Sequence, residues 1–576
     1  MSMNLVQAMD SIQRGENGHI EYSWSSQEIQ EYLVKLYFQL VRTDDMRDLE
    51  HQIEKLLDQM FVSPKENNKE IVMFCKMIAN VRDVDGNGKG EVSLSHMMLW
   101  CLYKRHRNLA TFLFEKFVSI PETHQYGSWK DVKYFCNYIK EKTGQEDHYF
   151  INYIVRLTNY YLRLESKITD DKKLTLISKW IPREKSKRFK WLFNLLARDY
   201  YSVYLTTAKD RVSRKKASLK AYGDYRKLLT SLNKRINTIQ VKMCDSRWSE
   251  IKPTEITSKT MSKQMMALLN QKREGTRMVE RSTSEDRRAC ANTLKQHLED
   301  VKNKKDGKKV NGKRCDVYEF VRDTFKYLRY GDDSKTQLEM IEAQWEDNKT
   351  RNVQQTTKII PLCDTSGSME CDECVPLYNA LGLSIRLSEI THPAFKDRIL
   401  TFSSEPEWVD LSEEKTLSEK LVKLKSARWG MNTNLYGAMK MILDALIIND
   451  VHPDEVDNLV LAIFSDMQID QAYTDNRKVL QDKLKQMFEL AGLESKYRQP
   501  YPVPHILYWN LRKTSGFPTK TTEPNVTMFS GYNSSLLNVF SEKGMEELVK
   551  ITPWDMLKTT LNNSRYECLD KWIDLI

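Results

Sequence analysis

Residues 358–369 read KIIPLCDTSGSM, an apolar run that ends directly in an aspartate and two serines. A continuous apolar run of this kind is typical of a parallel strand whose sheet is covered on both faces. Four similar runs follow, and helical stretches separate them near 372–390, 414–425, 433–448 and 475–492. Strands that alternate with helices predict a doubly wound, Rossmann-like α/β domain, which we assign to residues 351–576.

Oxygen-bearing side chains follow the ends of these strands. They are Asp364, Ser366 and Ser368 after the first strand, Thr433 after a glycine-containing turn, and Asp466 after LVLAIFSD. Because the carboxyl ends of parallel strands share one edge of the sheet, we expect the five side chains to meet there. Hydroxyl and carboxylate oxygens suit a hard cation, so the sequence predicts a site for Mg²⁺, ahead of Mn²⁺ or Ca²⁺. The alternative is a strand-to-helix turn with polar caps, which leaves Thr433 and Asp466 unexplained.

The combination of DxSxS, a later threonine and a later aspartate resembles the metal-ion-dependent adhesion site of von Willebrand factor A domains. The resemblance implies that Ser366, Ser368 and Thr433 coordinate the cation directly. It implies that Asp364 and Asp466 act mainly through bound waters and hydroxyls. It also implies one open coordination position, usually taken by a partner's carboxylate. Since no GxSxG elbow precedes a helix here, we expect a protein that is not an enzyme.

Residues 28–350 have a different pattern. Apolar residues recur three and four apart, as in EIQEYLVKLYFQLVRT at 28–43, which is the period of one helix face. Alternating strand patterns are absent, so we expect an α-solenoid of HEAT-like helical repeats without a strict period. Residues 1–27 are assigned to an N-terminal extension, and residues 301–315 to an exposed loop or short hairpin.

Charge is distributed unevenly along the chain. The net charge is +10, but residues 1–350 hold 64 basic and 48 acidic side chains, whereas the remainder is mildly acidic. A basic helical half favours binding of a polyanion to that half. A solvated, lysine-rich helical surface is the alternative interpretation.

Two basic stretches also carry aromatic residues. The first surrounds Trp180, Phe189 and Trp191, and the second flanks Tyr222 and Tyr225. Such mixtures suit single-stranded RNA, because cations contact phosphates and rings stack on unpaired bases. Helix packing by the aromatic rings is the alternative. The candidate RNA-binding residues are Arg183, Lys185, Lys187, Arg188, Lys190, Arg214, Lys215, Lys216, Lys220 and Arg226.

The two-part layout resembles the Ro autoantigen (TROVE) ribonucleoproteins and, more closely, a TROVE-like family. The motifs that carry this resemblance are Arg82-Asp83, Gly88-Lys89-Gly90-Glu91, Tyr126 to Asp131, Lys179 to Ser186, Gln344-Trp345 and Asp364 to Met369. The resemblance implies helices that curve into a ring, an A domain that helps to close it, and small structured or single-stranded RNA as a partner. We therefore expect a non-enzymatic, Ro-like ribonucleoprotein component. The alternative is an interaction scaffold or structural particle component whose A domain captures an acidic residue of a protein partner.

Several classes are disfavoured by composition. No run of eighteen apolar residues exists, so we expect no membrane span. The N-terminus lacks the basic-then-apolar layout of a secretory signal. Ten cysteines without a dense framework indicate reduced thiols. Reduced thiols and the lack of a signal layout together favour a cytoplasmic protein.

Overall fold

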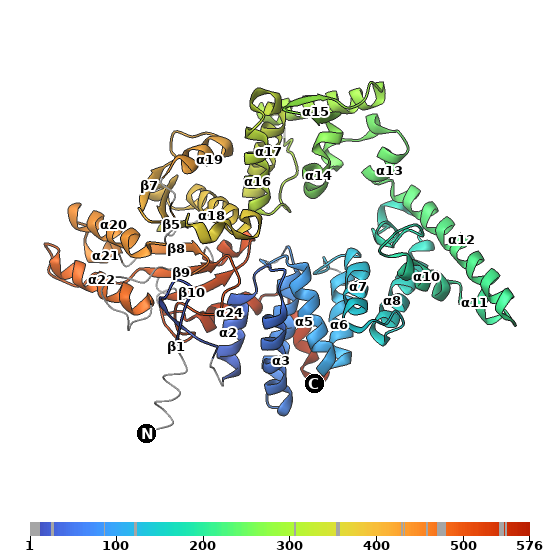
Figure 1. The fold of residues 1–576 in the computed structure, drawn as a ribbon, viewed down its shortest axis with the longest axis horizontal. Helices are drawn as coiled ribbons and strands as arrows, with labels where there is room; N and C mark the ends of the chain where they lie inside the picture. Colours follow the sequence, from blue (N-terminus) through green and yellow to red (C-terminus); the bar gives the residue numbers. More distant parts are fainter. Residues whose placement is uncertain are drawn as a thin grey trace.

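The structure is a computed structural model that describes most of the chain. The described residues are 12–24, 28–85, 87–119, 124–304, 307–352, 358–427, 430, 433–456, 459–468, 480–540, 547 and 550–575. A long array of helices precedes a region built on a six-stranded sheet (Figure 1). The expected combination of a helical region with an α/β domain is therefore confirmed.

Helices follow one another through the first half, as the spacing of apolar residues predicts. In α3, for example, Leu49, Ile53 and Leu56 lie on the buried face. The helices are α2 (Ile29–Gln39), α3 (Arg47–Val62), α4 (Asn68–Arg82), α5 (Val92–Arg105), α6 (Arg107–Val118), α7 (Lys130–Thr143), α8 (Tyr149–Ser166), α9 (Ile177–Trp180), α10 (Lys190–Tyr200), α11 (Ser202–Thr206), α12 (Arg211–Ile236), α13 (Ile239–Cys244), α14 (Ser258–Leu268), α15 (Glu285–Lys302), α16 (Val317–Leu328) and α17 (Lys335–Lys349).

Local signals set the ends of several of these helices. The side chain of Asp210 accepts hydrogen bonds from two amides of the first turn of α12 and so caps its beginning. Helix α7 ends at Gly144, whose φ of 71° lies in the left-handed region that favours glycine. Helix α9 ends at Trp180, shortly before Pro182, which lacks the amide hydrogen that a continuing helix needs.

Five strands of the sheet are the apolar runs that the sequence predicts. The order across the sheet is β10-β9-β8-β5-β6-β7, and all neighbours are parallel except β6 and β7. The strands are β5 (Lys358–Asp364), β6 (Arg398–Phe402), β7 (Glu407–Asp410), β8 (Leu459–Ser465), β9 (His505–Asn510) and β10 (Val526–Ser530). The antiparallel edge strand β7 was not predicted, because Val409 is its single buried residue and no apolar run marks it.

Helices of the helical array and of the α/β region both pack against this sheet. The helices of this region include α18 (Cys371–Ile390), α19 (Leu417–Ser426), α20 (Leu435–Ile448), α22 (Leu480–Glu494) and α24 (Pro553–Leu561). Helix α18 packs on β5 and on α16 of the helical array, whereas α24 packs on β10 and α2. In Figure 1 the array follows an arc from α2 through α12 to α17, and both ends of the arc meet the α/β region.

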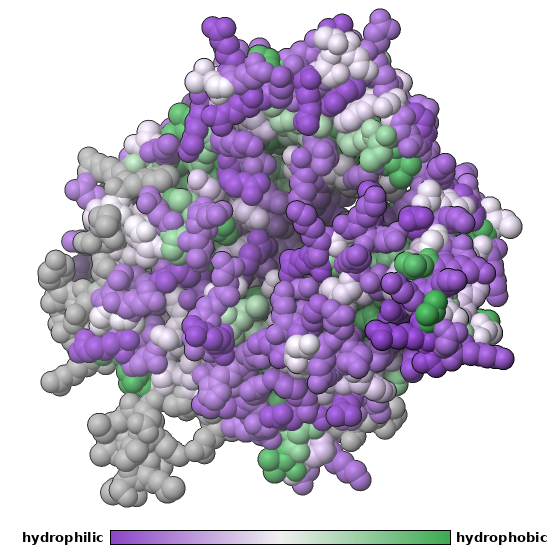
Figure 2. All heavy atoms as spheres, turned by 45° about the vertical axis from the view of Figure 1, so that its right-hand side comes forward, coloured by the Kyte–Doolittle hydropathy of each residue, from purple (hydrophilic) through white to green (hydrophobic). Residues whose placement is uncertain are grey.

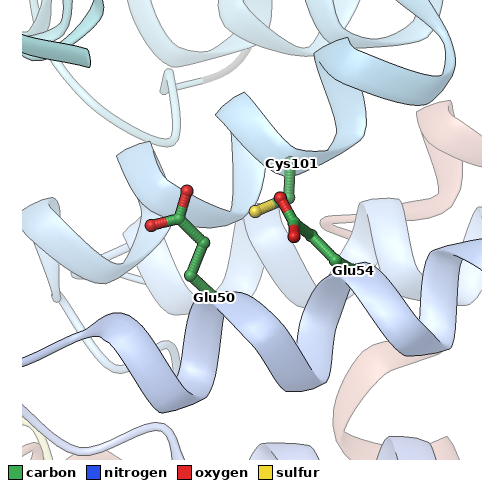
Figure 3. A group of neighbouring side chains, drawn as sticks. All are labelled: Glu50, Glu54 and Cys101. Carbon is green, nitrogen blue, oxygen red and sulfur yellow. The ribbon is translucent and has the colours of Figure 1, made fainter.

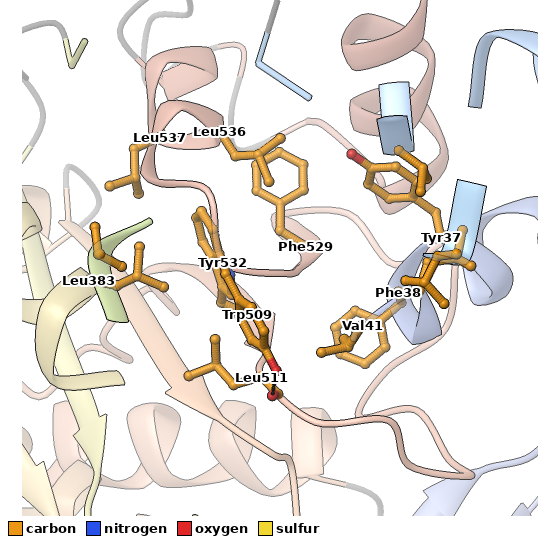
Figure 4. Close-up of a cluster of buried hydrophobic side chains, with 14 of the residues drawn as sticks. Tyr37, Phe38, Val41, Leu383, Trp509, Leu511, Phe529, Tyr532, Leu536 and Leu537 are labelled. Atoms are coloured by element: carbon orange, nitrogen blue, oxygen red, sulfur yellow. Dashed lines mark hydrogen bonds between the residues drawn. The ribbon is translucent and has the colours of Figure 1, made fainter. Parts of the chain in front are cut away.

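The helical array and the sheet share a continuous apolar core. Figure 4 shows Tyr37 and Phe38 of α2 in the same buried cluster as Trp509 of β9 and Phe529 of β10. The side chains of Phe38 and Trp509 are fully buried. Because the contact is apolar and continuous, we expect the two halves to be stabilised together.

Motif residues of the helical half form polar links to the sheet half. Lys89 Nζ donates to the carbonyl oxygen of Tyr37 at 2.6 Å and to the hydroxyl of Ser530 on β10. Arg565 Nη2 donates to Asp83 Oδ1 at 2.8 Å, and Asp83 is fully buried. These motif residues therefore hold the two halves together.

Two hairpins depart from the expected layout. The first, β1 (Ile12–Arg14) with β2 (Ile20–Tyr22), lies in the segment that we assigned to an N-terminal extension. The second, β3 (Gln271–Glu274) with β4 (Arg277–Glu280), lies in the half where strand patterns were thought to be absent. Both are short and carry few apolar residues, so they lack the alternation that marks a half-buried strand.

The segment 301–315 is also less exposed than expected. Val310 and Cys315 are buried, and a Cβ on Gly312 would lie 1.8 Å from the carbonyl oxygen of Gln344. Gly312 is required at this position because α17 approaches its backbone so closely. The expectation of an exposed loop is therefore wrong for Val310, Gly312 and Cys315, whereas Lys313 and Arg314 are exposed.

Among the described residues, no helix combines the length and the apolarity that crossing a bilayer requires.

Candidate functional site

The loop after β5 places three oxygen-bearing side chains at the edge of the sheet. Asp364 Oδ1 accepts a hydrogen bond from the amide of Ser366 at 2.9 Å, which holds the loop in a tight turn. The other carboxylate oxygen of Asp364 accepts from the hydroxyl of Ser465, the last residue of β8. The hydroxyls of Ser366 and Ser368 lie 3.1 Å apart. The first part of the site is therefore built around the fully buried Asp364.

Asp466 follows β8 and faces the same loop. Its Oδ1 accepts from the amide of Gln468 at 3.1 Å, and its Oδ2 accepts from Arg512 Nε at 2.9 Å. Its carboxylate is also a hydrogen-bond partner of Ser368 and lies close enough to Asp364 for the two charges to interact. Adjacent parallel strands β5 and β8 thus bring together residues that are about a hundred positions apart in the sequence.

Thr433 lies on the third segment of this edge. Gly430 forms a parallel bridge with Ser366, and the amide of Asn434 donates to the carbonyl oxygen of Ser403, just beyond β6, at 3.0 Å. Thr433 lies between these two anchored positions and is buried. The segment that carries Thr433 is therefore held beside the 364–368 loop.

Electrostatics at this edge favour a cation. Burial and the nearby charge of Asp466 raise the pKa of Asp364 to about 7. Burial also raises the pKa of Asp466, although the charge of Arg512 opposes that effect. Two buried carboxylates with one guanidinium leave negative charge that a divalent ion would neutralise. The oxygen-only donor set fits Mg²⁺, which would supply a Lewis-acidic position for a further oxygen ligand.

The start of α18, which follows the 364–368 loop, is strained. Asp372, Glu373 and Cys374 have φ values of 49°, 59° and 62°, a left-handed conformation that costs L-residues on the order of 1 kcal/mol each. Cys371 and Cys374 are both partly exposed. This strain was not predictable from the sequence, because none of the three residues is glycine.

A second group of potential ligands is already neutralised. Figure 3 shows Glu50 and Glu54 of α3 beside Cys101 of α5. Lys104 pairs with Glu54, and Lys142 lies 2.5 Å from Glu50. Burial raises the pKa of the Cys101 thiol to about 12, so the sulfur is not a thiolate. We assign no metal to this group.

The ten predicted RNA-binding residues are all exposed, but they are spread over two places. Arg226 Nη1 donates to Glu184 at 2.6 Å, and Arg188 lies 3.3 Å from Glu141, so two of the ten are already paired. Arg214 is twelve residues from Arg226 on α12, which is roughly 18 Å along a helix. The two stretches therefore meet at Arg226 and Glu184, whereas Arg214 lies farther along α12.

The structure instead brings together lysines that the sequence interpretation missed. They lie on three elements: Lys130 and Lys133 on α7, Lys179 on α9 and Lys263 on α14. Burial and the charge of Lys263 lower the pKa of Lys130, so α7 and α14 bring like charges close together. Among the described residues, none of the four forms an ion pair with a carboxylate. This group is called the lysine cluster below.

Aromatic rings border the lysine cluster. Lys133 Nζ lies 4.8 Å from the ring centre of Trp180, and Lys179 Nζ lies 5.5 Å from it. Trp180 also lines a cleft of about 490 Å³ together with Trp129, Tyr161 and Glu165. The Trp129-Lys130 and Lys179-Trp180 motifs were the sequence signal for this site, but their proximity depends on the fold.

A buried carboxyl group also lines this cleft. Glu165 is 3% exposed, and its Oε2 accepts a hydrogen bond from the amide of Thr175 at 3.1 Å. Its Oε1 has no hydrogen-bond partner in the part of the chain that the structure describes. Buried polar atoms are usually satisfied, so an unsatisfied oxygen in a cleft indicates a position for a donor.

The molecular surface is mostly hydrophilic and hollowed near its centre in the view of Figure 2.

Comparison with known proteins gives two findings. Residues 358–566 match the model of a domain of unknown function, DUF7788, and the match begins at the first residue of β5. The chain is also 24% identical over 500 residues to Uncharacterized protein L728 of Acanthamoeba polyphaga mimivirus, covering 84% of this chain and 79% of the viral protein. The similarity to the viral protein thus extends over helical and α/β regions alike.

Proposed function

We propose that the chain is a non-enzymatic RNA-binding protein, similar to the Ro ribonucleoproteins, that holds single-stranded RNA at the lysine cluster. One observation carries the proposal: unpaired lysines on three separate elements meet beside a tryptophan-lined cleft. Like charges that face one another cost free energy unless an anionic ligand neutralises them. The two-part layout, with an arc of helices that returns to an α/β domain, supports a TROVE-like assignment.

The chemistry of the cleft suits a nucleotide. Lysines contact phosphates as point charges, and Trp180 offers a face on which a base can stack. The free oxygen of Glu165 would accept a hydrogen bond from an exocyclic amino group of the base. A stacked base, a phosphate and an amino donor together describe one unpaired nucleotide, which a duplex does not offer in this form.

Binding of a labelled single-stranded RNA, followed by fluorescence anisotropy over a range of salt concentrations, tests the proposal. The variant Lys130→Ala/Lys133→Ala/Lys179→Ala should lose affinity and lower the salt slope by about 2, since each single-strand phosphate contact contributes about 0.7. A matched control, Lys215→Ala/Lys216→Ala/Lys220→Ala, removes equal charge from the exposed part of α12. Equal losses in both variants, or wild-type binding no stronger than that of a neutral protein, would overturn the proposal.

The edge of the sheet favours a second function. We propose that residues 351–576 form a von Willebrand factor A-like domain that binds Mg²⁺ through Asp364, Ser366, Ser368, Thr433 and Asp466 and captures a carboxylate of a protein partner. The support is the buried pair of carboxylates with adjacent hydroxyls at one sheet edge. Asp364→Ala should abolish Mg²⁺ binding in calorimetry while leaving the circular dichroism spectrum intact. Unchanged Mg²⁺ binding in this variant would refute the site.

A further inference from the structure

The N-terminal hairpin docks beside the candidate metal site. The amide of Tyr22, in β2, donates to the carbonyl oxygen of Phe517 at 2.9 Å, and the amide of Phe517 donates back at 3.0 Å. Gln13 Nε2 donates to the hydroxyl of Ser515 at 3.0 Å. The hairpin is therefore fixed to the segment that follows β9, although 502 positions separate Gln13 from Ser515 in the sequence.

The turn of this hairpin reaches the loop that carries Asp466. The amide of Glu16 donates to Gln468 Oε1 at 2.7 Å, and Asn17 Nδ2 donates to the carbonyl oxygen of Gln468 at 2.8 Å. Gln468 lies two residues after Asp466, and its own amide donates to the Asp466 carboxylate. Both the backbone and a side chain of the turn thus contact the metal edge.

One guanidinium joins the turn to the site. Arg512 Nε donates to Asp466 Oδ2 at 2.9 Å, and Arg512 Nη2 donates to Glu16 Oε2 at 2.7 Å. These two nitrogens form one edge of the planar guanidinium, so the two carboxylates lie side by side. Asp466 is fully buried, whereas the Glu16 side chain is 55% exposed.

We infer that Glu16 is the carboxylate that takes the open coordination position of the cation, so that the N-terminal hairpin is a ligand supplied by the chain itself. The inference rests on the proposed Mg²⁺ site. Arg512 would hold both carboxylates less strongly if a divalent cation occupied this edge, because the two positive charges would repel each other. Glu16 is a hard oxygen donor, and it shares the guanidinium of Arg512 with Asp466. Its turn is already anchored through Gln468. A carboxylate from a protein partner must then displace Glu16.

The ordinary alternative is a surface ion pair. An exposed pair of this kind is worth about 0.2–1 kcal/mol and has no effect on a neighbouring metal. The chain offers a matched pair for comparison: Asp48 of α3 lies 2.8 Å from Lys513, the residue next to Arg512. Asp48 makes the same type of contact but no contact with the Asp466 loop among the described residues.

Calorimetry with Mg²⁺ on the full chain distinguishes a Glu16 that binds the cation from a Glu16 that forms only a surface ion pair. Glu16→Gln should weaken Mg²⁺ binding by about tenfold, a loss typical of removing a group that supports a metal site. Asp48→Asn should leave the affinity within about twofold of wild type, because distant sites act independently. In hydrogen exchange, Mg²⁺ should slow the amides of residues 12–22 in the wild type but not in Glu16→Gln.

The outcomes distinguish this inference from the proposed metal site. If the wild type binds Mg²⁺, Asp364→Ala does not, and Glu16→Gln binds as the wild type with unchanged hairpin exchange, then the site stands and the inference is overturned. If the wild type binds no Mg²⁺, both are overturned. Loss of affinity in Asp48→Asn as large as in Glu16→Gln would also overturn the inference, because a general loss of negative charge would then explain the effect.

Discussion

Replacing Asp83 with asparagine tests whether the motif residues join the two halves of the molecule. The Asp83 carboxylate is fully buried and accepts hydrogen bonds from Arg565 at 2.8 Å and from the hydroxyl of Tyr566 at 3.1 Å. Removing one partner of a buried pair costs about 3–5 kcal/mol, because the remaining charge is left uncompensated. Since the Arg565 side chain is 18% exposed, we expect the lower end, about 3 kcal/mol.

Urea unfolding followed by tryptophan fluorescence measures this loss. The shared apolar core predicts a single transition for both halves, and Asp83→Asn should move that transition to lower urea. Asp85→Asn is the control: Asp85 lies 2.9 Å from Arg314 but is 36% exposed, so its loss should cost less than about 1 kcal/mol. Equal midpoints for the two variants, or separate transitions for the two halves of the wild type, would refute the reasoning.

The remaining predictions concern a carboxyl group, a ring and the cation. Burial raises the pKa of Glu342 from 4.5 to about 7, so the stability it contributes is present below pH 4.5 and lost as the pH rises through 7. Glu342→Gln should therefore flatten the fall of the urea midpoint between about pH 5 and 8; a fall as steep as that of the wild type would contradict this. Trp180→Ala should weaken RNA binding about tenfold, since stacking is worth about 1–3 kcal/mol per base, whereas Trp191→Ala, outside the cleft, should not. Removing divalent cations with EDTA should leave RNA affinity within about twofold, because the lysine cluster and the metal edge share no residue; a larger loss would mean that the two sites are coupled.

The sheet, and the meeting of Asp364 and Asp466 at one edge of it, were largely predictable from sequence. An apolar run that ends in Asp364 or Asp466 predicts both a buried strand and the polar residue at its carboxyl end. Parallel pairing then places such ends at one edge without further information. The edge strand β7 was not predictable in this way, because its pairing with β6 depends on backbone contacts and not on an apolar pattern.

The contacts between distant segments were not predictable. Glu16 and Arg512 are 496 positions apart, and no local pattern in either segment indicates the other. Lys130 and Lys263 likewise meet through the path of the intervening helices. The sequence interpretation selected the basic stretches near 183–190 and 211–226 because their charge is contiguous in sequence. In the structure Arg226 pairs with Glu184 of the first stretch, whereas Arg214 lies several turns away along α12. Sequence charge density therefore identified the basic half without locating the cluster.

Ultraviolet crosslinking of the full chain to a single-stranded RNA, followed by mass spectrometry of the crosslinked peptides, tests the central claim most directly. The account predicts crosslinks in peptides that contain Trp129, Tyr161 or Trp180, the rings of the cleft beside the lysine cluster. Crosslinks confined to residues 211–226, or none above a neutral control protein, would contradict it.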